Sequence, residues 1–129
     1  MGFSITWDNA EQTILRVTYD GHWDLEDFRS SNSQAYEMIK SVAHPVNVIL
    51  DMRLSSGMPN GFGSAIRDVN RGMPLNTGQI ILVQKNLLVE IMVNAMSRLV
   101  RGQRRPFTMV HTLDEARRLA VSPREPDEL

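Results

Sequence analysis

The chain has 129 residues, of which 42% are hydrophobic and 22% charged, and its 14 basic and 15 acidic side chains leave a net charge of −1. This composition is typical of a globular protein, and the length fits one domain that buries about two-thirds of its unfolded surface. The absence of cysteine excludes disulfides, thiol nucleophiles and cysteine-containing metal sites. The near-neutral charge argues against a general nucleic-acid binder, which carries a strong positive excess.

No segment of the sequence resembles a membrane span or a secretory signal. The longest aliphatic run is Ile80–Val83, whereas a bilayer helix needs about 20 apolar residues. The start Met1–Thr6 fits an N-myristoylation pattern. However, Phe3, Ile5 and Trp7 alternate with polar residues, which is typical of a half-buried strand. We therefore expect a cytoplasmic protein without stable membrane insertion.

The first part of the chain predicts a β-hairpin, a long helix and a buried strand. Alternating apolar residues indicate strands over Phe3–Asp8 and Thr13–Tyr19, and the short link between them favours antiparallel pairing. A helix is predicted from its N-cap Asp24 to a stop at His44–Pro45. The dense apolar run Val46–Met52 is typical of a strand buried on both faces.

The second part alternates helices with strands. In chain order we predict a glycine- and serine-rich loop (Ser55–Gly61), a helix (Phe62–Met73), a strand (Gln79–Gln84), a helix between Asn86 and Gly102, a strand (Phe107–Val110) and a helix with a capping box (Thr112–Ala120). The order β-β-α-β-α-β-α-β-α indicates an α/β fold with a mixed, mainly parallel five-stranded sheet and four helices. We expect one domain over residues 1–122 and a short acidic tail over residues 123–129.

The residue types that carry chemistry do not assemble into a recognisable motif. His22, His44 and His111 lack the spacing of metal ligands, and no Gly-x-Ser-x-Gly elbow supplies a nucleophile. The glycines from Gly57 to Gly63 lack the lysine and hydroxyl residue of a phosphate-binding loop. We therefore expect no catalytic residue, no metal and no cofactor, and a protein that is not an enzyme.

Asp51 belongs to one suggestive local pattern. The stretch Val48–Gly61 resembles the phosphoacceptor strand of a two-component receiver. A receiver also needs a second acid beside Asp8 to hold Mg²⁺, a helix between its first two strands and a lysine after the last strand. The sequence has none of these. A receiver, or an uncharacterised enzyme that uses Asp51, is therefore the third of our alternatives.

Three stretches together carry a broader resemblance, namely Tyr19–Phe28, Val48–Asp51 and Phe107–Ala116. With the order of elements, they make residues 3–121 similar to the STAS domain, the fold of sporulation anti-sigma-factor antagonists, and specifically to its SpoIIAA-like branch. The resemblance implies a bacterial regulatory module. In the antagonists a kinase phosphorylates a serine of an Asp-Ser-Ser-Gly motif. This chain has Ser55-Ser56-Gly57 with Leu54 in place of the aspartate, which weakens the implied phospho-switch.

Charge is distributed unevenly along the chain. Residues 1–64 carry 4 basic and 8 acidic side chains, whereas residues 65–129 carry 10 and 7. Four arginines, at positions 98, 101, 104 and 105, lie at the end of a predicted helix, where the helix dipole favours cations. The alternative interpretation is that they face an acidic partner or an anionic group.

We therefore predict a non-catalytic protein-interaction or regulatory module with an unidentified protein partner, and we leave a homodimer open. The expected working surface is the loop Arg53–Gly63 with the helix that follows it. Its candidate interaction or switch residues are Asp51, Arg53, Ser55, Ser56, Asn60, Ser64, Arg67 and Arg71. The alternative is a small-ligand or lipid-binding protein, because the resembled fold borders the Sec14-like lipid carriers.

Overall fold

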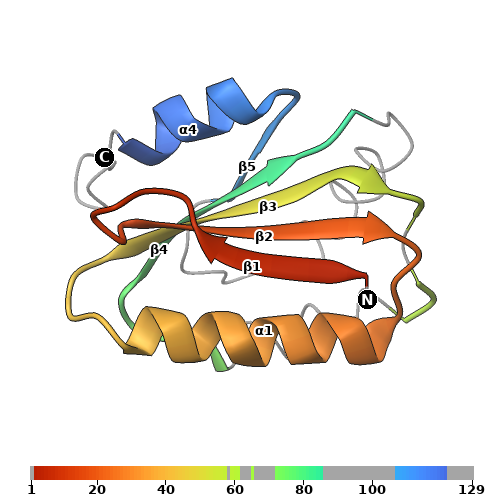
Figure 1. Ribbon diagram of the computed structural model, residues 1–129, viewed down its shortest axis with the longest axis horizontal. Helices are drawn as coiled ribbons and strands as arrows, with labels where there is room; N and C mark the ends of the chain where they lie inside the picture. Colours follow the sequence, from red (N-terminus) through yellow and green to blue (C-terminus); the bar gives the residue numbers. More distant parts are fainter. Residues whose placement is uncertain (1, 58, 62–64, 66–71, 86–106, 122–129) are drawn as a thin grey trace.

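Five strands form one mixed sheet in the order in which they occur along the chain. The strands are β1 (Phe3–Trp7), β2 (Ile14–Gly21), β3 (Val46–Ser55), β4 (Thr77–Val83) and β5 (Phe107–Val110). β1 is antiparallel to β2, and all later neighbours are parallel. The structure is a computed structural model that describes residues 2–57, 59–61, 65, 72–85 and 107–121 (Figure 1). The predicted α/β class with a mixed five-stranded sheet is confirmed.

The hairpin between β1 and β2 depends on one asparagine. The Asn9 side-chain oxygen accepts hydrogen bonds from the backbone N–H groups of Thr13 and Ile14, both at 3.1 Å. This asparagine-centred turn brings the chain back antiparallel to β1, as the short link predicted. Gln12 takes a left-handed conformation (φ 57°) within the turn.

Helix α1 (Leu25–Lys40) begins where the sequence predicted. Asp24 and Asp27 form a reciprocal capping box, which satisfies backbone donors at the helix start. The predicted end at His44–Pro45 is wrong, because the last helical residue is Lys40. The side-chain amide of Asn76 explains the early end, since it donates to the carbonyl oxygens of Ile39, Val42 and His44 at 2.9–3.1 Å.

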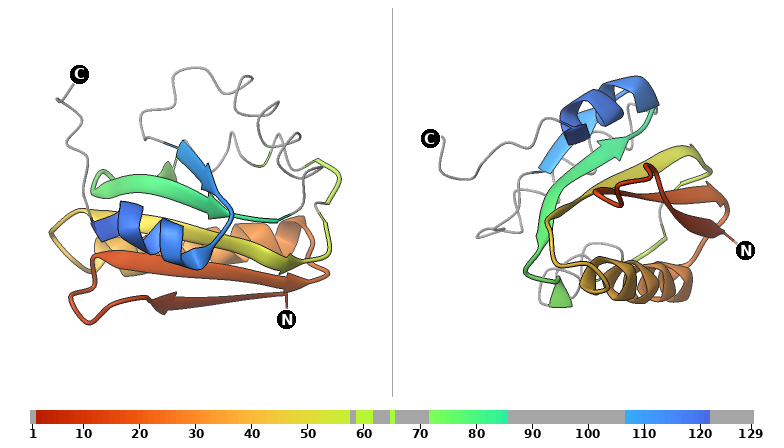
Figure 2. Two further views of the ribbon diagram at one scale, coloured as in Figure 1. Left: turned by 90° about the horizontal axis from the view of Figure 1, so that it is seen from above. Right: turned by 60° about the vertical axis from the view of Figure 1, so that its left-hand side comes forward.

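The two described helices cover opposite faces of the sheet (Figures 1 and 2). On one face α1 packs over the larger core, whose biggest buried side chains include Trp23, Tyr19 and Leu15. On the other face helix α4 (Leu113–Val121) packs over a smaller cluster that includes Ile49, Ile81 and Val110. Side chains at alternate positions of each strand thus point to opposite faces of the sheet, one toward the larger core and the other toward the smaller cluster.

The predicted helices Phe62–Met73 and Asn86–Gly102 lie largely or wholly outside the described residues, as does the acidic tail. Of the four predicted helices, α1 and α4 are the two whose bounds lie within the described residues. Within the described part of the chain, no helix has both the length and the apolar composition needed to cross a bilayer.

Candidate functional site

The described residues cover only part of the sheet face opposite α1. Helix α4 packs against β3, β4 and β5, and Figure 2 shows it above that part of the sheet. On β1 and β2 the side chains that alternate with the residues of the larger core lie on this face, and apart from Ile14 they are polar. We call this surface the open face and define it by Ser4, Thr6, Arg16, Thr18, Asp51 and Arg53. Its β1 side chains are exposed, and those of β2 are half-buried.

Asp51 and Arg53 form an ion pair on β3, the strand of the open face that also contacts α4. They are two residues apart on β3, so both side chains project on the same side of the strand. The Arg53 guanidinium donates two hydrogen bonds to the Asp51 carboxylate, from Nε at 2.9 Å and from Nη2 at 2.8 Å. Asp51 is only 2% exposed, whereas the Arg53 side chain keeps 31% of its surface accessible.

This pairing holds Asp51 in its charged form. Burial by itself raises the pKa of the Asp51 carboxyl, but hydrogen bonds from the Arg53 side chain and backbone, with the charges of Arg53 and Arg16, outweigh it. The pKa of Asp51 therefore lies below its ordinary value. In turn, the hydrogen bonds to Asp51 raise the pKa of Arg53.

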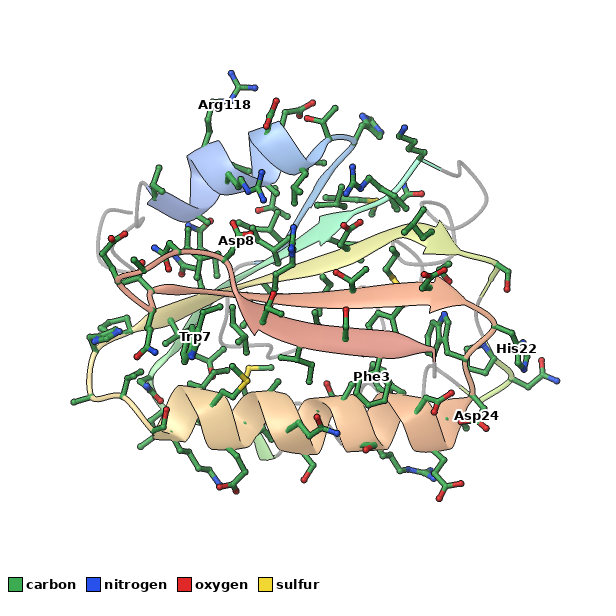
Figure 3. All side chains as sticks on the ribbon, viewed as in Figure 1. Phe3, Trp7, Asp8, His22, Asp24 and Arg118 are labelled. Atoms are coloured by element: carbon green, nitrogen blue, oxygen red, sulfur yellow. The ribbon has the colours of Figure 1, made fainter. Side chains whose placement is uncertain are left out.

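A second buried carboxylate, Asp8, lies between the end of β1 and α4 (Figure 3). It accepts two hydrogen bonds from Arg117 of α4, at 2.9 and 3.0 Å, and one of its oxygens lies 3.6 Å from Arg16 Nη1. The Asp8 side chain is 4% exposed, while those of Arg16 and Arg117 are 30% and 44% exposed. The acid is thus buried beneath two accessible cations.

Together these residues form what we call the arginine cluster, which consists of Arg16, Arg53 and Arg117 with Asp8 and Asp51. Three cations share these two carboxylates, and the charge of a third carboxylate, Asp114 of α4, also acts on Arg117. The charges therefore balance, while the three guanidinium groups stay partly accessible. Each guanidinium has five N–H donors, more than these ion pairs use. Among the described residues, Arg16 Nε is buried without a hydrogen-bond acceptor. The cluster is therefore suited to accept a further carboxylate or phosphate.

The two candidate switch serines lie at the end of β3 and differ in their surroundings. Ser55 is within β3, so its predicted place in a loop is wrong. Its hydroxyl accepts a hydrogen bond from the Trp23 indole at 2.7 Å and donates to the Gly57 carbonyl at 2.9 Å. Ser56 is exposed, and its hydroxyl and its N–H both donate to the Gly21 carbonyl at 2.9 Å. Ser56 is the more accessible of the two hydroxyls.

The other predicted residues are only partly described. Asn60 is exposed in a turn, beyond the end of β3. Ser64, Arg67 and Arg71 lie outside the described residues. The structure thus brings together Asp51 and Arg53 of the predicted set, and places Ser55 and Ser56 at the far end of the same strand.

The described residues also place the three histidines. All are exposed, and His44 Nε2 lies 2.8 Å from the Gln12 carbonyl oxygen. Within the described residues, no three histidine or carboxylate side chains gather in a way that could hold a metal ion.

Sequence reasoning missed Arg16, Arg117 and Asp8 as members of the site. The sequence contained one signal for Arg16. It is a charged residue within the apolar strand Ile14–Val17, and it lies on the same face of the strand as Ile14. No local signal pairs Asp8 with Arg117, since 109 positions separate them.

Comparison with known proteins supports the fold. No protein-family model and no curated protein matches the chain. A solved structure that does match is the crystal structure of an uncharacterised protein of the DUF3478 family, described as having a SpoIIAA-like fold, from Shewanella loihica PV-4. The TM-score is 0.68, and the match covers 92% of this chain and 94% of that one at 12% identity. The chain therefore has a SpoIIAA-like fold, as its resemblance predicted, and the likeness extends to the fold alone.

Proposed function

We propose that this protein is a non-catalytic interaction module that binds an acidic segment of a partner protein on its open face. The observation that carries the proposal is the group of three partly accessible guanidinium groups in the arginine cluster. Two buried carboxylates hold the guanidinium groups of Arg53 and Arg117 by two hydrogen bonds each, and Arg16 Nη1 lies 3.6 Å from Asp8. Fixed arginines lose little conformational entropy when an acidic group binds, so such a site is preorganised.

The surroundings of the cluster also suit a peptide. Ser4, Thr6 and Thr18 provide small hydroxyl side chains next to Arg16 on β1 and β2. These side chains leave the sheet surface accessible and offer further hydrogen-bond donors. A carboxylate-rich segment lying across β1 and β2 would therefore meet both charge and hydrogen-bonding groups.

The two acids of the cluster are poorly suited to catalysis. A general acid or base works best when its pKa lies near the working pH. Asp51 is instead held ionised, with both carboxylate oxygens bonded to Arg53. Asp8 is likewise bonded through both oxygens to Arg117. This arrangement supports binding as the role of the cluster.

A heteronuclear NMR titration with an oligoglutamate peptide tests the proposal. We expect salt-sensitive amide shifts at Arg16, Thr18 and Arg53, and an oligolysine peptide of the same length should produce none there. Shifts confined to other parts of the chain, or equal shifts with both peptides, would contradict the proposal. Turnover in a hydrolase screen that Asp51→Asn abolishes would replace it with an enzymatic function.

A further inference from the structure

β1 forms an edge of the sheet (Figure 2), and the hairpin reveals which way its backbone groups point. The Asp8 N–H donates to the Ile14 carbonyl at 2.8 Å, and the Asp20 N–H donates to the Gly2 carbonyl at 2.9 Å. In an antiparallel ladder, hydrogen-bonded pairs alternate with pairs that exchange no hydrogen bond. The even-numbered residues of β1 therefore bond to β2, and the N–H and C=O groups of its odd-numbered residues point away from the sheet.

The β1 sequence lacks the features that usually protect an edge strand. Natural edges carry a charged residue, a proline or a bulge that prevents further pairing. Phe3–Trp7 has none of these and pairs with β2 in continuous register. Its absence of charge also means that two copies of the strand can approach without repulsion between like charges.

The strand is also nearly symmetric in chemistry. Read in either direction, it has an aromatic residue, a hydroxyl residue, isoleucine, a hydroxyl residue and an aromatic residue. Antiparallel pairing of two copies centred on Ile5 places Phe3 opposite Trp7 and Ser4 opposite Thr6. Apolar residues then meet apolar residues and hydroxyl residues meet hydroxyl residues, so the strand is complementary to itself, as a two-fold symmetric interface requires.

We infer that the β1 edge is a docking surface for a second copy of this chain, paired antiparallel about a two-fold axis at Ile5. In this register, Ile5 faces Ile5 and Phe3 faces Trp7, and all of these have outward-pointing backbone groups. Each such pair is of the hydrogen-bonded type, in which the two residues exchange two backbone hydrogen bonds. A register shifted by one residue cannot form these bonds. A register shifted by two residues can form them, but it leaves part of the five-residue strand unpaired.

The side chains on the two faces support the same register. Phe3 and Trp7 lie on the α1 side of β1 (Figure 3) and are half-buried against the larger core. Pairing brings each aromatic ring next to an aromatic ring of the second copy, a favourable cross-strand contact. Ser4 and Thr6 meet on the open face, where both are exposed.

The helices extend the contact beyond the strands. α1 packs against β1 and β2, so the two-fold axis places the two α1 helices side by side on one face of the continuous sheet. Specific interfaces bury about 1,200 Å² or more of surface, and a pair of short strands buries little. Contact between the two helices would add to this buried area. On the other face the two open faces become adjacent. The inference does not depend on what the open face binds.

Cysteine cross-linking tests the register directly, because the chain contains no cysteine. Opposite residues in a pair without hydrogen bonds have Cα atoms about 4.5 Å apart, within the range for a disulfide. An oxidised mixture of Ser4→Cys and Thr6→Cys proteins should therefore yield mainly the mixed disulfide dimer. Each variant alone should cross-link several-fold less, since diagonal residues lie about 7–8 Å apart. No cross-linking, or equal cross-linking of all combinations, would overturn the inference.

A pair of charge variants provides a second, independent measurement. In Ser4→Lys/Thr6→Glu, lysine meets glutamate across the axis, whereas in Ser4→Glu/Thr6→Glu, glutamate meets glutamate. Sedimentation velocity over a concentration series should show a dimer for the first variant and a monomer for the second at the same concentration. Thermal unfolding should show that both variants fold. Equal dimerisation of two folded variants, or a monomeric wild-type chain at every concentration, would overturn the inference.

Discussion

Asp8 and Arg117, 109 positions apart in the chain, form a two-hydrogen-bond ion pair that joins the end of β1 to α4. The pair connects the hairpin at the start of the chain with the helix that follows the last strand. It also fixes Arg117 beside the other arginines of the cluster. One contact therefore serves both the fold and the proposed binding surface.

Replacement of Asp8 by alanine should lower the free energy of unfolding by about 1–3 kcal/mol, because charge-assisted hydrogen bonds are lost. The exposed Asp20→Ala on the same hairpin is the matched control, with an expected change within about 0.5 kcal/mol. Urea denaturation measures both. A double-mutant cycle with Arg117→Ala should give a coupling of about 1 kcal/mol. Equal effects of the two aspartate variants would show that the ion pair contributes no stability.

Asp51→Asn should reduce stability by about 1–3 kcal/mol at neutral pH, and the loss should depend on pH. The pKa of Asp51 in the folded protein lies below its ordinary value of 3.8. As pH falls, the unfolded chain therefore takes up the proton first. The stability from the Arg53 pair is complete above about pH 4 and is lost below it as pH falls through the folded pKa. Urea titrations from neutral pH to about 3 should show the two proteins converging, and a constant difference would contradict the pairing.

Tyrosine ionisation should be suppressed in the folded protein. Burial raises the pKa of Tyr19 to about 12, although the hydrogen bond with Ser31 (2.7 Å) opposes this. Burial also raises the pKa of Tyr36. The unfolded chain thus loses its tyrosine protons first, and stability should fall as pH rises from about 10 to about 12.

Ultraviolet absorbance of tyrosinate measures this effect. In Tyr36→Phe, whose remaining tyrosine is Tyr19, the signal should appear only near pH 12 together with unfolding. A reversible titration near pH 10 in the folded state would contradict the burial of the hydroxyl.

The two serines at the end of β3 should differ in their effect on stability. Ser55→Ala removes the acceptor of the partly buried Trp23 indole hydrogen bond and should cost about 1–3 kcal/mol. Ser56→Ala removes a hydrogen bond from an exposed side chain, so its cost should be within about 0.5 kcal/mol. Thermal unfolding of both variants distinguishes them. A reversed order would mean that Ser56, and not Ser55, holds the chain end in place.

Local signals predicted most of the described fold. Asp24 as an N-cap was sufficient to locate the start of α1, because a cap acts on neighbouring residues. The apolar run Val46–Met52 similarly predicted a strand buried on both faces. The end of β3 was not predictable in this way. Ser55 continues the strand because it pairs with Gly21 and binds Trp23, and both contacts are distant in sequence.

The arginine cluster also depends on contacts that are distant in sequence, so local signals did not predict it. Asp51 and Arg53 were both candidate residues, but the strand was predicted to end at Met52, so their pairing on one strand follows only from the observed length of β3. To place Arg16 in the cluster, one must know the parallel register of β2 and β3, which sets Arg16 opposite Ile49. The addition of Arg117 requires the packing of α4 over the sheet. Strand order and register depend on the whole chain, so a cluster of this kind cannot be predicted from single segments of the sequence.

Binding of an oligoglutamate peptide to the wild type and two matched variants, measured by isothermal titration calorimetry, tests the proposed function most directly. Thr18→Glu adds a negative charge next to Asp51 on the open face, whereas Gln34→Glu adds the same charge to the exposed surface of α1, on the opposite side of the sheet. We expect Thr18→Glu to weaken binding at least about fivefold, or ~1 kcal/mol, and Gln34→Glu to bind like the wild type. Equal affinities of all three proteins, or no binding by the wild type, would contradict the open face as an acidic-partner site.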